Sequence, residues 1–308
     1  MQVWRGKAGG TSNRVLRAGE QPRGIAPAVS VVIGTLDRRW YLQRTIESVR
    51  AELGSRDGEI IVVDGGSSDG TVDWLAKQKD VLTIVQHNRG TWRDRAVRRR
   101  SWGYFMNLGF KTASAPYVCM LSDDCLAVPG AIGEGLNVFE RHEQRLGAVA
   151  FYWRNWPEED AYHVGRTFGD RVFVNHGLFA REALEAVGFA DEDAFGFYHA
   201  DGDLALRLDA AGWPCVDSPS SFVEHFSHAN VDLRGANAQR QSDDWTAYAA
   251  RWEHLGGPSQ AWVTREFVDP HRTAERYWGR RARWTPRLNE VRRRARTLPR
   301  RLARLGHG

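Results

Sequence analysis

Two short apolar runs, rich in Val and Ile and separated by a helical pattern, constrain the fold of this 308-residue chain most strongly. The first run covers 29–33 and the second covers 59–63. Runs of this length without polar alternation are typical of strands that are buried on both faces of a parallel sheet. The apolar residues between them recur at the spacing of one helix face. They are Leu42, Ile46, Val49 and Leu53.

Further strands and helices extend this alternation along the chain. Strands are expected at 81–85 and 117–121, and a short helix is expected to follow Asp69. A strand–helix–strand–helix–strand order implies a parallel sheet with right-handed crossovers. The predicted fold class is therefore α/β, with a Rossmann-like, mostly parallel sheet.

The second half of the chain has a different texture. Short strands at 148–152 and 171–175 are expected to alternate with turns, and helices are expected at 202–211 and 238–255. The sequence thus predicts a mixed second half attached to the parallel sheet.

The composition argues for an ordinary globular protein of the reducing cytosol. The leader at 1–27 is polar and lacks the apolar run of a signal peptide, and no stretch of about 18 apolar residues predicts a membrane span. Cys119, Cys125 and Cys215 form no Cys-x-x-Cys pair. Their spacing indicates neither a disulfide framework nor a zinc site, so we expect a cytoplasmic protein.

The C-terminal segment 256–308 is predicted to be a basic helical tail. Residues 276–308 contain twelve arginines and one glutamate, so the rest of the chain is acidic although the whole chain carries +5. An apolar stripe runs through the tail, and a basic amphipathic helix suits the surface of an anionic membrane. A solvated helix is the alternative, and nucleic acid is not expected because no recognition fold accompanies the charge. The stripe consists of Leu288, Val291, Ala295, Leu298, Leu302 and Leu305.

Acidic residues follow the predicted strands at their carboxyl ends, where open α/β sheets bind ligands. Asp123 and Asp124 come after the strand at 117–121. Such carboxylates can hold a divalent cation, Mn²⁺ or Mg²⁺, that offsets the charge of a leaving nucleotide diphosphate. A helix cap or a turn is the alternative. Asp64 follows the second strand and can accept a hydrogen bond from a nucleotide base, or close an Asx-turn before Gly65 and Gly66.

Two further positions carry candidate chemistry. Asp201 lies at the start of the predicted helix at 202–211, where it can serve as a general base or as an N-cap. His225 or His228 can complete the ligands of a metal through a ring nitrogen, although a histidine in the core or on the surface is the more common case.

Several segments resemble the signatures of the family 2 glycosyltransferases, which have the GT-A fold. The segment EIIVVDGGSSDGT at 59–71 is close to the family pattern VVDxGSxDGT and is the most specific match. The resemblance runs from about 28 to 252 and predicts a GT-A domain at 28–255. The other matching segments are 28–38, 117–125, 188–192 and 200–207.

The resemblance implies a role for each candidate residue. Asp64 would bind the base of the donor, with Thr35 and Asp37 lining the same pocket. Asp123 would lie near the ribose. Asp124 and His225 would bind the metal. Asp201 would be the catalytic base.

The implied reaction is transfer of a hexose, with inversion, from a nucleotide-diphosphate sugar, most commonly a UDP-sugar. The acceptor would be a hydroxyl of a glycan, a lipid-linked glycan or a small molecule, as in polysaccharide biosynthesis. A peripheral position on the inner face of a membrane, reached through the basic tail, is a further expectation.

The sequence also departs from the family pattern. Ala200 stands where the family has Glu, and Ser122 stands where it has the first acid of Asp-x-Asp. A catalytically inactive homologue that binds nucleotide sugar or membrane is therefore an alternative. A sugar-phosphate nucleotidylyltransferase is a second alternative, but 34–38 lacks its Gly-rich basic loop. The segment 88–107 is longer than usual, and its arginines can clamp a diphosphate or an anionic acceptor, or form a solvated loop.

Overall fold

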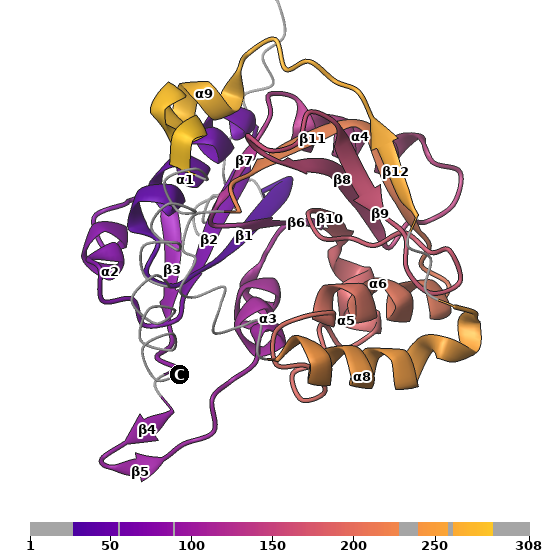
Figure 1. Cartoon of the computed structure of the whole chain (residues 1–308), viewed down its shortest axis with the longest axis horizontal. Helices are drawn as coiled ribbons and strands as arrows, with labels where there is room; N and C mark the ends of the chain where they lie inside the picture. Colours follow the sequence, from indigo (N-terminus) through magenta and orange to yellow (C-terminus); the bar gives the residue numbers. More distant parts are fainter. Residues whose placement is uncertain (1–26, 55, 89, 228–239, 258–260, 286–308) are drawn as a thin grey trace, which may run out of the picture.

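A central sheet with helices on both faces forms the body of the molecule (Figure 1). The computed structural model describes residues 27–54, 56–88, 90–227, 240–257 and 261–285. The main path through the sheet runs in the order β3-β2-β1-β6-β10-β8-β9-β12, and β11 pairs with β8 and β7. The strands are β1 (Val29–Thr35), β2 (Gly58–Asp64), β3 (Val81–Val85), β6 (Tyr117–Ser122), β7 (Cys125–Ala127), β8 (Ala148–Asn155), β9 (Tyr162–Gly165), β10 (Gly177–Ala180), β11 (Cys215–His225) and β12 (Trp262–Arg265).

The predicted α/β class is confirmed. Strands β1, β2, β3 and β6 are mutually parallel, whereas β10 is antiparallel to both β6 and β8. The first half of the chain therefore supplies the parallel part of the sheet and the second half supplies the mixed part. The helices are α1 (Arg39–Leu53), α2 (Thr71–Leu75), α3 (Trp102–Thr112), α4 (Ala131–Arg141), α5 (Arg181–Ala186), α6 (Ala200–Ala210), α8 (Gln241–Trp252) and α9 (Thr273–Trp278), with 3-10 turns η1 (Glu253–Leu255) and η2 (Arg280–Trp284).

Alternating residues of β1 pack into two different cores. Val31 and Ile33 lie in the core formed with α1 and α4, whereas Val32 lies in the core formed with α3, α5 and α6. Each strand is therefore apolar on both sides, which explains the uninterrupted Val and Ile runs. The helix predicted from residues at 42, 46, 49 and 53 is present, and all of these side chains are buried.

Gly109 shows how closely helix α3 approaches the sheet. A Cβ atom at this position would lie 2.3 Å from Cγ1 of Val32. We expect Gly109→Ala to lower the free energy of unfolding by about 1–3 kcal/mol, because the helix or the strand must move to accept the methyl group. Urea unfolding measures the effect. Thr112→Ala, at an exposed position of the same helix, is the matched control and should change stability far less.

Three predicted elements need correction. Residues 171–175 do not form a strand, because Val172 makes only an isolated bridge to Arg166. The helix expected at 202–211 begins two residues earlier and ends one residue earlier. Within 238–255, α8 begins at Gln241 and a 3-10 turn ends at Leu255.

The segment predicted as the beginning of a basic tail is partly built into the body. Strand β12 pairs with β9, so it extends the main sheet. Trp278 of α9 is buried in a small core with Trp156 and Phe226. The described residues on the two sides of the expected boundary at 255–256 therefore pack together. The apolar stripe predicted from 288 to 305 lies outside the described residues.

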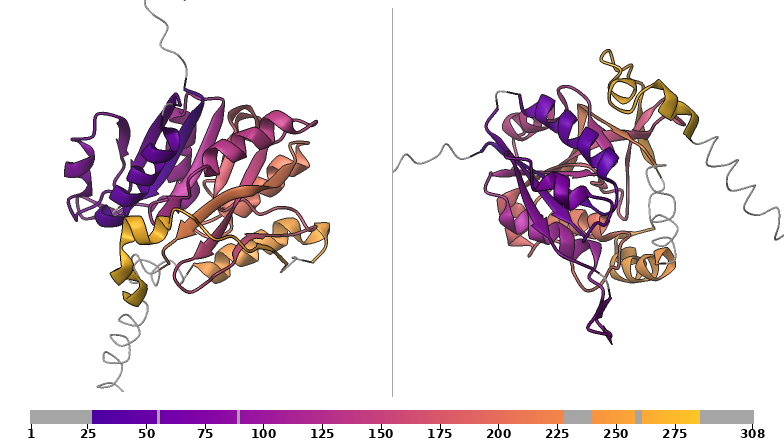
Figure 2. Two further views of the ribbon diagram at one scale, coloured as in Figure 1. Left: turned by 90° about the horizontal axis from the view of Figure 1, so that it is seen from above. Right: turned by 90° about the vertical axis from the view of Figure 1, so that its left-hand side faces the viewer.

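Part of the long segment 88–107, including Arg93 and Arg95, forms a hairpin that projects from the body. Strands β4 (Thr91–Trp92) and β5 (Arg95–Ala96) form a separate two-stranded sheet, which extends away from the main sheet (Figures 1 and 2). Arg98 pairs with Asp193, and the exposed arginines in the described part of this segment are Arg93, Arg95, Arg98, Arg99 and Arg100. Within the described ranges, no helix is long and apolar enough to cross a lipid bilayer.

Candidate active site

The carboxyl ends of three parallel strands bring the predicted acidic residues to one edge of the sheet. In the register of the strands, Thr35 of β1 lies opposite Asp64 of β2, and Gly34 lies opposite Ser122 of β6. Asp123 and Asp124 follow directly after Ser122. The sequence therefore placed these residues at the correct edge of the sheet.

Asp123 and Asp124 are almost completely buried, at 3% and 1% exposure. The Thr35 hydroxyl donates a hydrogen bond of 2.7 Å to Oδ2 of Asp123. One guanidinium nitrogen of Arg38 donates to Oδ1 of Asp123 at 2.8 Å and to Oδ2 of Asp124 at 2.9 Å. Arg38 thus bridges both carboxylates, a role that the sequence did not reveal.

The charges of this cluster depend on one another. Burial by itself lowers the pKa of Arg38, but the two adjacent carboxylates outweigh this effect and raise it far above its ordinary value. Burial raises the pKa of Asp123, and the Arg38 charge opposes that rise. Arg38 therefore acts as the counter-charge that lets two buried acids lie side by side.

Asp64 closes the turn that the sequence offered as one of its two roles, and it keeps a second oxygen that the turn does not use. Its Oδ1 accepts hydrogen bonds from the backbone N–H groups of Gly66 and Ser67, both at 2.7 Å. Its Oδ2 is buried and has no hydrogen-bond partner among the described residues. An unpaired buried carboxylate oxygen is costly, so its position at a strand end points to a ligand N–H as its partner.

The loop beside Asp64 is fixed by Asp37 and by a glycine. Oδ1 of Asp37 accepts from the backbone N–H of Ser68 at 2.6 Å, and the backbone N–H of Asp37 donates to Oγ of Ser67 at 2.9 Å. Gly66 has φ +92°, and a Cβ there would lie 2.2 Å from Nδ1 of His87. Asp37 thus holds the loop that contains Asp64.

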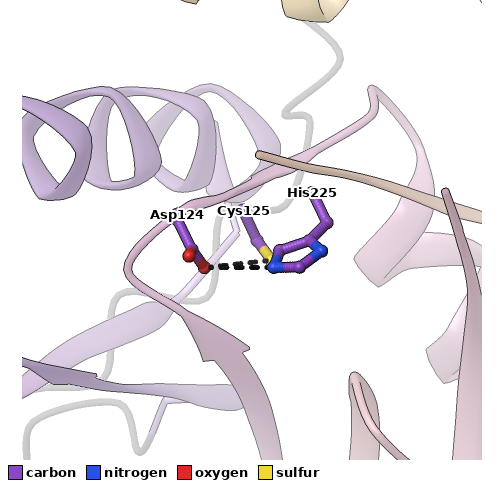
Figure 3. A group of neighbouring side chains, drawn as sticks. All are labelled: Asp124, Cys125 and His225. Atoms are coloured by element: carbon purple, nitrogen blue, oxygen red, sulfur yellow. Dashed lines mark hydrogen bonds and ion pairs between the residues drawn. The ribbon is translucent and has the colours of Figure 1, made fainter. Parts of the chain in front are cut away.

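Asp124, Cys125 and His225 form a group of possible metal ligands (Figure 3). Strand β11 places His225 directly opposite Cys125 of β7. Nε2 of His225 lies 3.6 Å from Oδ1 of Asp124, and one ligand atom from each residue falls within 4.8 Å of the others. The sequence predicted His225 as a ligand but not Cys125. The two residues are 100 positions apart in the chain, so their spacing does not show that they lie side by side.

The imidazole of His225 is oriented by an amide. Its Nδ1 lies 2.8 Å from Oδ1 of Asn155, an oxygen that can only accept, so Nδ1 donates to Asn155 and the ring is held with Nε2 facing Asp124. A carboxylate oxygen is a suitable ligand for Mn²⁺ and Mg²⁺, and an imidazole nitrogen suits transition-metal ions, so the residues fit a divalent cation. His228 lies outside the described residues.

Asp201 lies in the first turn of α6, where burial raises the pKa of its carboxyl group. Nδ2 of Asn175 donates to Oδ2 at 2.9 Å, and the Gly202 N–H donates to Oδ1 at 3.0 Å; both bonds oppose the rise. The N-cap position belongs to His199, so Asp201 is not the cap of this helix. Asp203 is completely buried, and its carboxylate accepts hydrogen bonds from Arg207, Arg251 and Trp252. These contacts give it a structural role.

Two adjacent residues connect Asp201 to the metal-ligand group. Asn175 contacts Asp201, and Nε2 of the next residue, His176, lies 3.5 Å from Sγ of Cys125. Burial, with a smaller contribution from His225, lowers the pKa of the His176 imidazole to about 3, and Asp124 opposes this shift. The structure therefore brings the candidate base and the candidate ligands to the same region, through residues that the sequence did not single out.

Comparisons with known proteins identify the family and the fold. Residues 30–187 match the family described as Glycosyl transferase family 2. An uncharacterized protein, y4gI, of Sinorhizobium fredii is 24% identical in an alignment of 277 positions that covers 79% of this chain and 28% of the relative. An uncharacterized glycosyltransferase, alr2836, of Nostoc sp. is 30% identical over 117 residues, or 36% of this chain and 33% of the relative. The chain thus spans a third or less of these relatives.

A solved structure shows the same architecture. The mannosyltransferase PcManGT from Pyrobaculum calidifontis, in complex with GDP-Man and Mn²⁺, superposes with a TM-score of 0.53 at 17% identity. The similarity covers 74% of this chain and 65% of the mannosyltransferase, and it shows a shared GT-A fold. With more than half of its length matching the family, the chain belongs to glycosyl transferase family 2.

Proposed function

We propose that this protein transfers a hexose, with inversion, from a nucleotide-diphosphate sugar to an acceptor hydroxyl. The observation that carries the proposal is the link made by Asn175 and His176 between Asp201 and the group that contains Asp124 and His225. A base for the acceptor and ligands for a cation on the donor diphosphate are then within one site.

Each residue has a defined task in this proposal. Oδ2 of Asp64 accepts a hydrogen bond from the base, with Thr35 and Asp37 holding the surrounding groups and Asp123 near the ribose. Asp124 and His225 hold Mn²⁺ or Mg²⁺, which supplies positive charge at the leaving diphosphate when bound.

The reaction then follows from the position of the base. Asp201 takes the proton from the acceptor hydroxyl as that oxygen attacks the anomeric carbon. The bond from this carbon to the diphosphate oxygen breaks on the opposite face, so the configuration inverts.

Uridine is the first choice of base because it is the most common one among the family 2 glycosyltransferases. Asp64 offers an acceptor to the imide N–H of uracil, and thymine and guanine carry a comparable N–H, so the three nucleotides must be compared directly. The acceptor is proposed to be a glycan, a lipid-linked glycan or a small molecule of polysaccharide biosynthesis. Contact with an anionic membrane surface through the basic C-terminal segment is part of the same proposal.

The proposed donor site predicts a specific binding result. Wild-type protein should bind UDP more tightly than GDP or dTDP, and Mn²⁺ should strengthen that binding. In Asp64→Asn, an amide N–H replaces an acceptor oxygen, so UDP affinity should fall about 10–100-fold, the equivalent of one lost charge-assisted hydrogen bond. Isothermal titration calorimetry with each nucleotide, with and without Mn²⁺ or Mg²⁺, measures both effects.

Asp73→Asn is the matched control, because this exposed residue of α2 lies in the helix that follows the same loop. Its UDP affinity should equal that of the wild type. Failure of the wild type to bind any nucleoside diphosphate would reject the proposed function. Binding without any transfer would favour an inactive homologue, the alternative that Ala200 and Ser122 suggest.

A further inference from the structure

Cys125 adds a sulfur atom to a site that otherwise contains oxygen and nitrogen. Its Sγ lies 4.0 Å from Oδ1 of Asp124, and Nε2 of His225 lies 3.6 Å from the same oxygen. Bonds of about 2.0–2.3 Å to a tetrahedral ion place neighbouring ligand atoms roughly 3.5 Å apart. These two separations are close to this value, and all three ligand atoms lie within 4.8 Å of one another, so small side-chain movements bring them to one ion.

From this geometry, we propose that Asp124, Cys125 and His225 form a binding site for a thiophilic divalent cation, with Zn²⁺ as the expected ion. Asp124 and His225 are also the residues that hold the donor's cation in the proposed function. Binding of Zn²⁺ to this site does not require that sugar transfer occurs. Spacing along the chain gave no sign of such a site, because the sulfur and the imidazole come from different strands.

The surroundings of the three residues favour ligation. The Nδ1–H of His225 is held by Asn155 at 2.8 Å, which aims Nε2 at Asp124. Nε2 of His176 lies 3.5 Å from the sulfur and gives Cys125 a polar neighbour inside the protein. The ring of Trp153 lies edge-on to the rings of His225 and His176, so an aromatic wall limits the movement of both.

The ligand set determines which ion binds best. Thiolate sulfur prefers zinc over magnesium, and imidazole also suits zinc. Binding replaces the S–H bond of Cys125 with a sulfur–metal bond, and the proton leaves to solvent, so affinity should rise with pH. Zn²⁺ held in this way would occupy the side chains needed for the donor's cation and would therefore inhibit a Mn²⁺-dependent transfer.

Cobalt provides a readout that is independent of activity. Co²⁺ bound to a thiolate gives a sulfur-to-metal charge-transfer absorption in the near ultraviolet, whereas Co²⁺ bound only to oxygen and nitrogen does not. Wild-type protein should show this band, and Zn²⁺ should remove it by displacing Co²⁺. Competition with a chromophoric chelator gives the Zn²⁺ affinity.

Cys125→Ser should abolish the band and weaken Zn²⁺ binding at least about tenfold, with little effect on Mn²⁺ binding. Cys215→Ser is the matched control, because that sulfur lies 3.6 Å from the carbonyl oxygen of Ala205, in another part of the fold. Thermal unfolding checks that each variant is folded, and Cys125→Ala repeats the test if the serine variant is unstable.

The outcomes separate this inference from the proposed function. A band that is absent in the wild type, or that persists in Cys125→Ser, overturns the zinc site even if sugar transfer is observed. A band with the predicted dependence on Cys125, in a protein that turns over no nucleotide sugar, supports the zinc site and rejects the transfer. Asp201→Asn should keep the band, because that residue is not a ligand in this proposal.

Discussion

Replacing Asp201 with Asn is expected to slow sugar transfer by about 10²–10⁴-fold while the donor still binds. The amide keeps the shape of the side chain, and it can still accept the hydrogen bond from Asn175 or Gly202. It cannot take a proton from an acceptor hydroxyl. The loss should therefore appear in kcat, whereas the dissociation constant of the donor should change little.

The pH dependence of the wild type gives a second test of the same assignment. Burial raises the pKa of Asp201, and only the ionised carboxylate can act as a base. As the pH falls through this raised pKa, kcat/KM should decrease, starting at a higher pH than for an exposed aspartate. A pH–rate profile of the wild type measures the position of this acidic limb.

Asp209→Asn is a suitable control for both measurements. Asp209 lies near the other end of α6 and pairs with Arg171, so its replacement removes one charge from the same helix without touching the proposed site. This variant should keep the wild-type rate and pH profile. Transfer near the wild-type rate in Asp201→Asn would show that another group is the base.

The parallel half of the fold could be predicted because its signals are local. A short run rich in Val and Ile indicates a strand that is buried on both faces of the sheet. The last residue of the run marks the carboxyl end of that strand, where ligands bind in open α/β sheets. This reasoning placed Asp64, Asp123 and Asp124 correctly without any knowledge of distant contacts.

The rest of the site depends on contacts between distant parts of the chain. Arg38 bridges acids 85 and 86 residues away, and Asn155 orients His225 from 70 residues away. No periodicity in the sequence encodes such pairings. Asn175 is the last residue of a segment that was expected to be a strand, and His176 follows directly after it, so the expected pattern gave no sign of their contacts with Asp201 and Cys125.

Asp203→Ala should give the largest loss of stability among the variants considered. The buried carboxylate accepts hydrogen bonds from Arg207 at 2.8 Å, from Arg251 at 2.9 Å and from the indole N–H of Trp252 at 2.9 Å. It therefore ties α6 to α8. Removing one partner of a buried ion pair costs roughly 3–5 kcal/mol, and the partial exposure of Arg251 places the expected loss near about 3 kcal/mol.

Urea unfolding measures this loss, and Asp193→Ala is the control, because Asp193 is highly exposed and its pair with Arg98 should contribute little. A loss below about 1 kcal/mol in Asp203→Ala would contradict the structural role. Measuring transfer and folding in parallel then distinguishes the roles of Asp201 and Asp203. In Asp203→Ala, transfer should fall only in proportion to the unfolded fraction, since the folded molecules keep Asp201. In Asp201→Asn, transfer should be lost from protein that is fully folded.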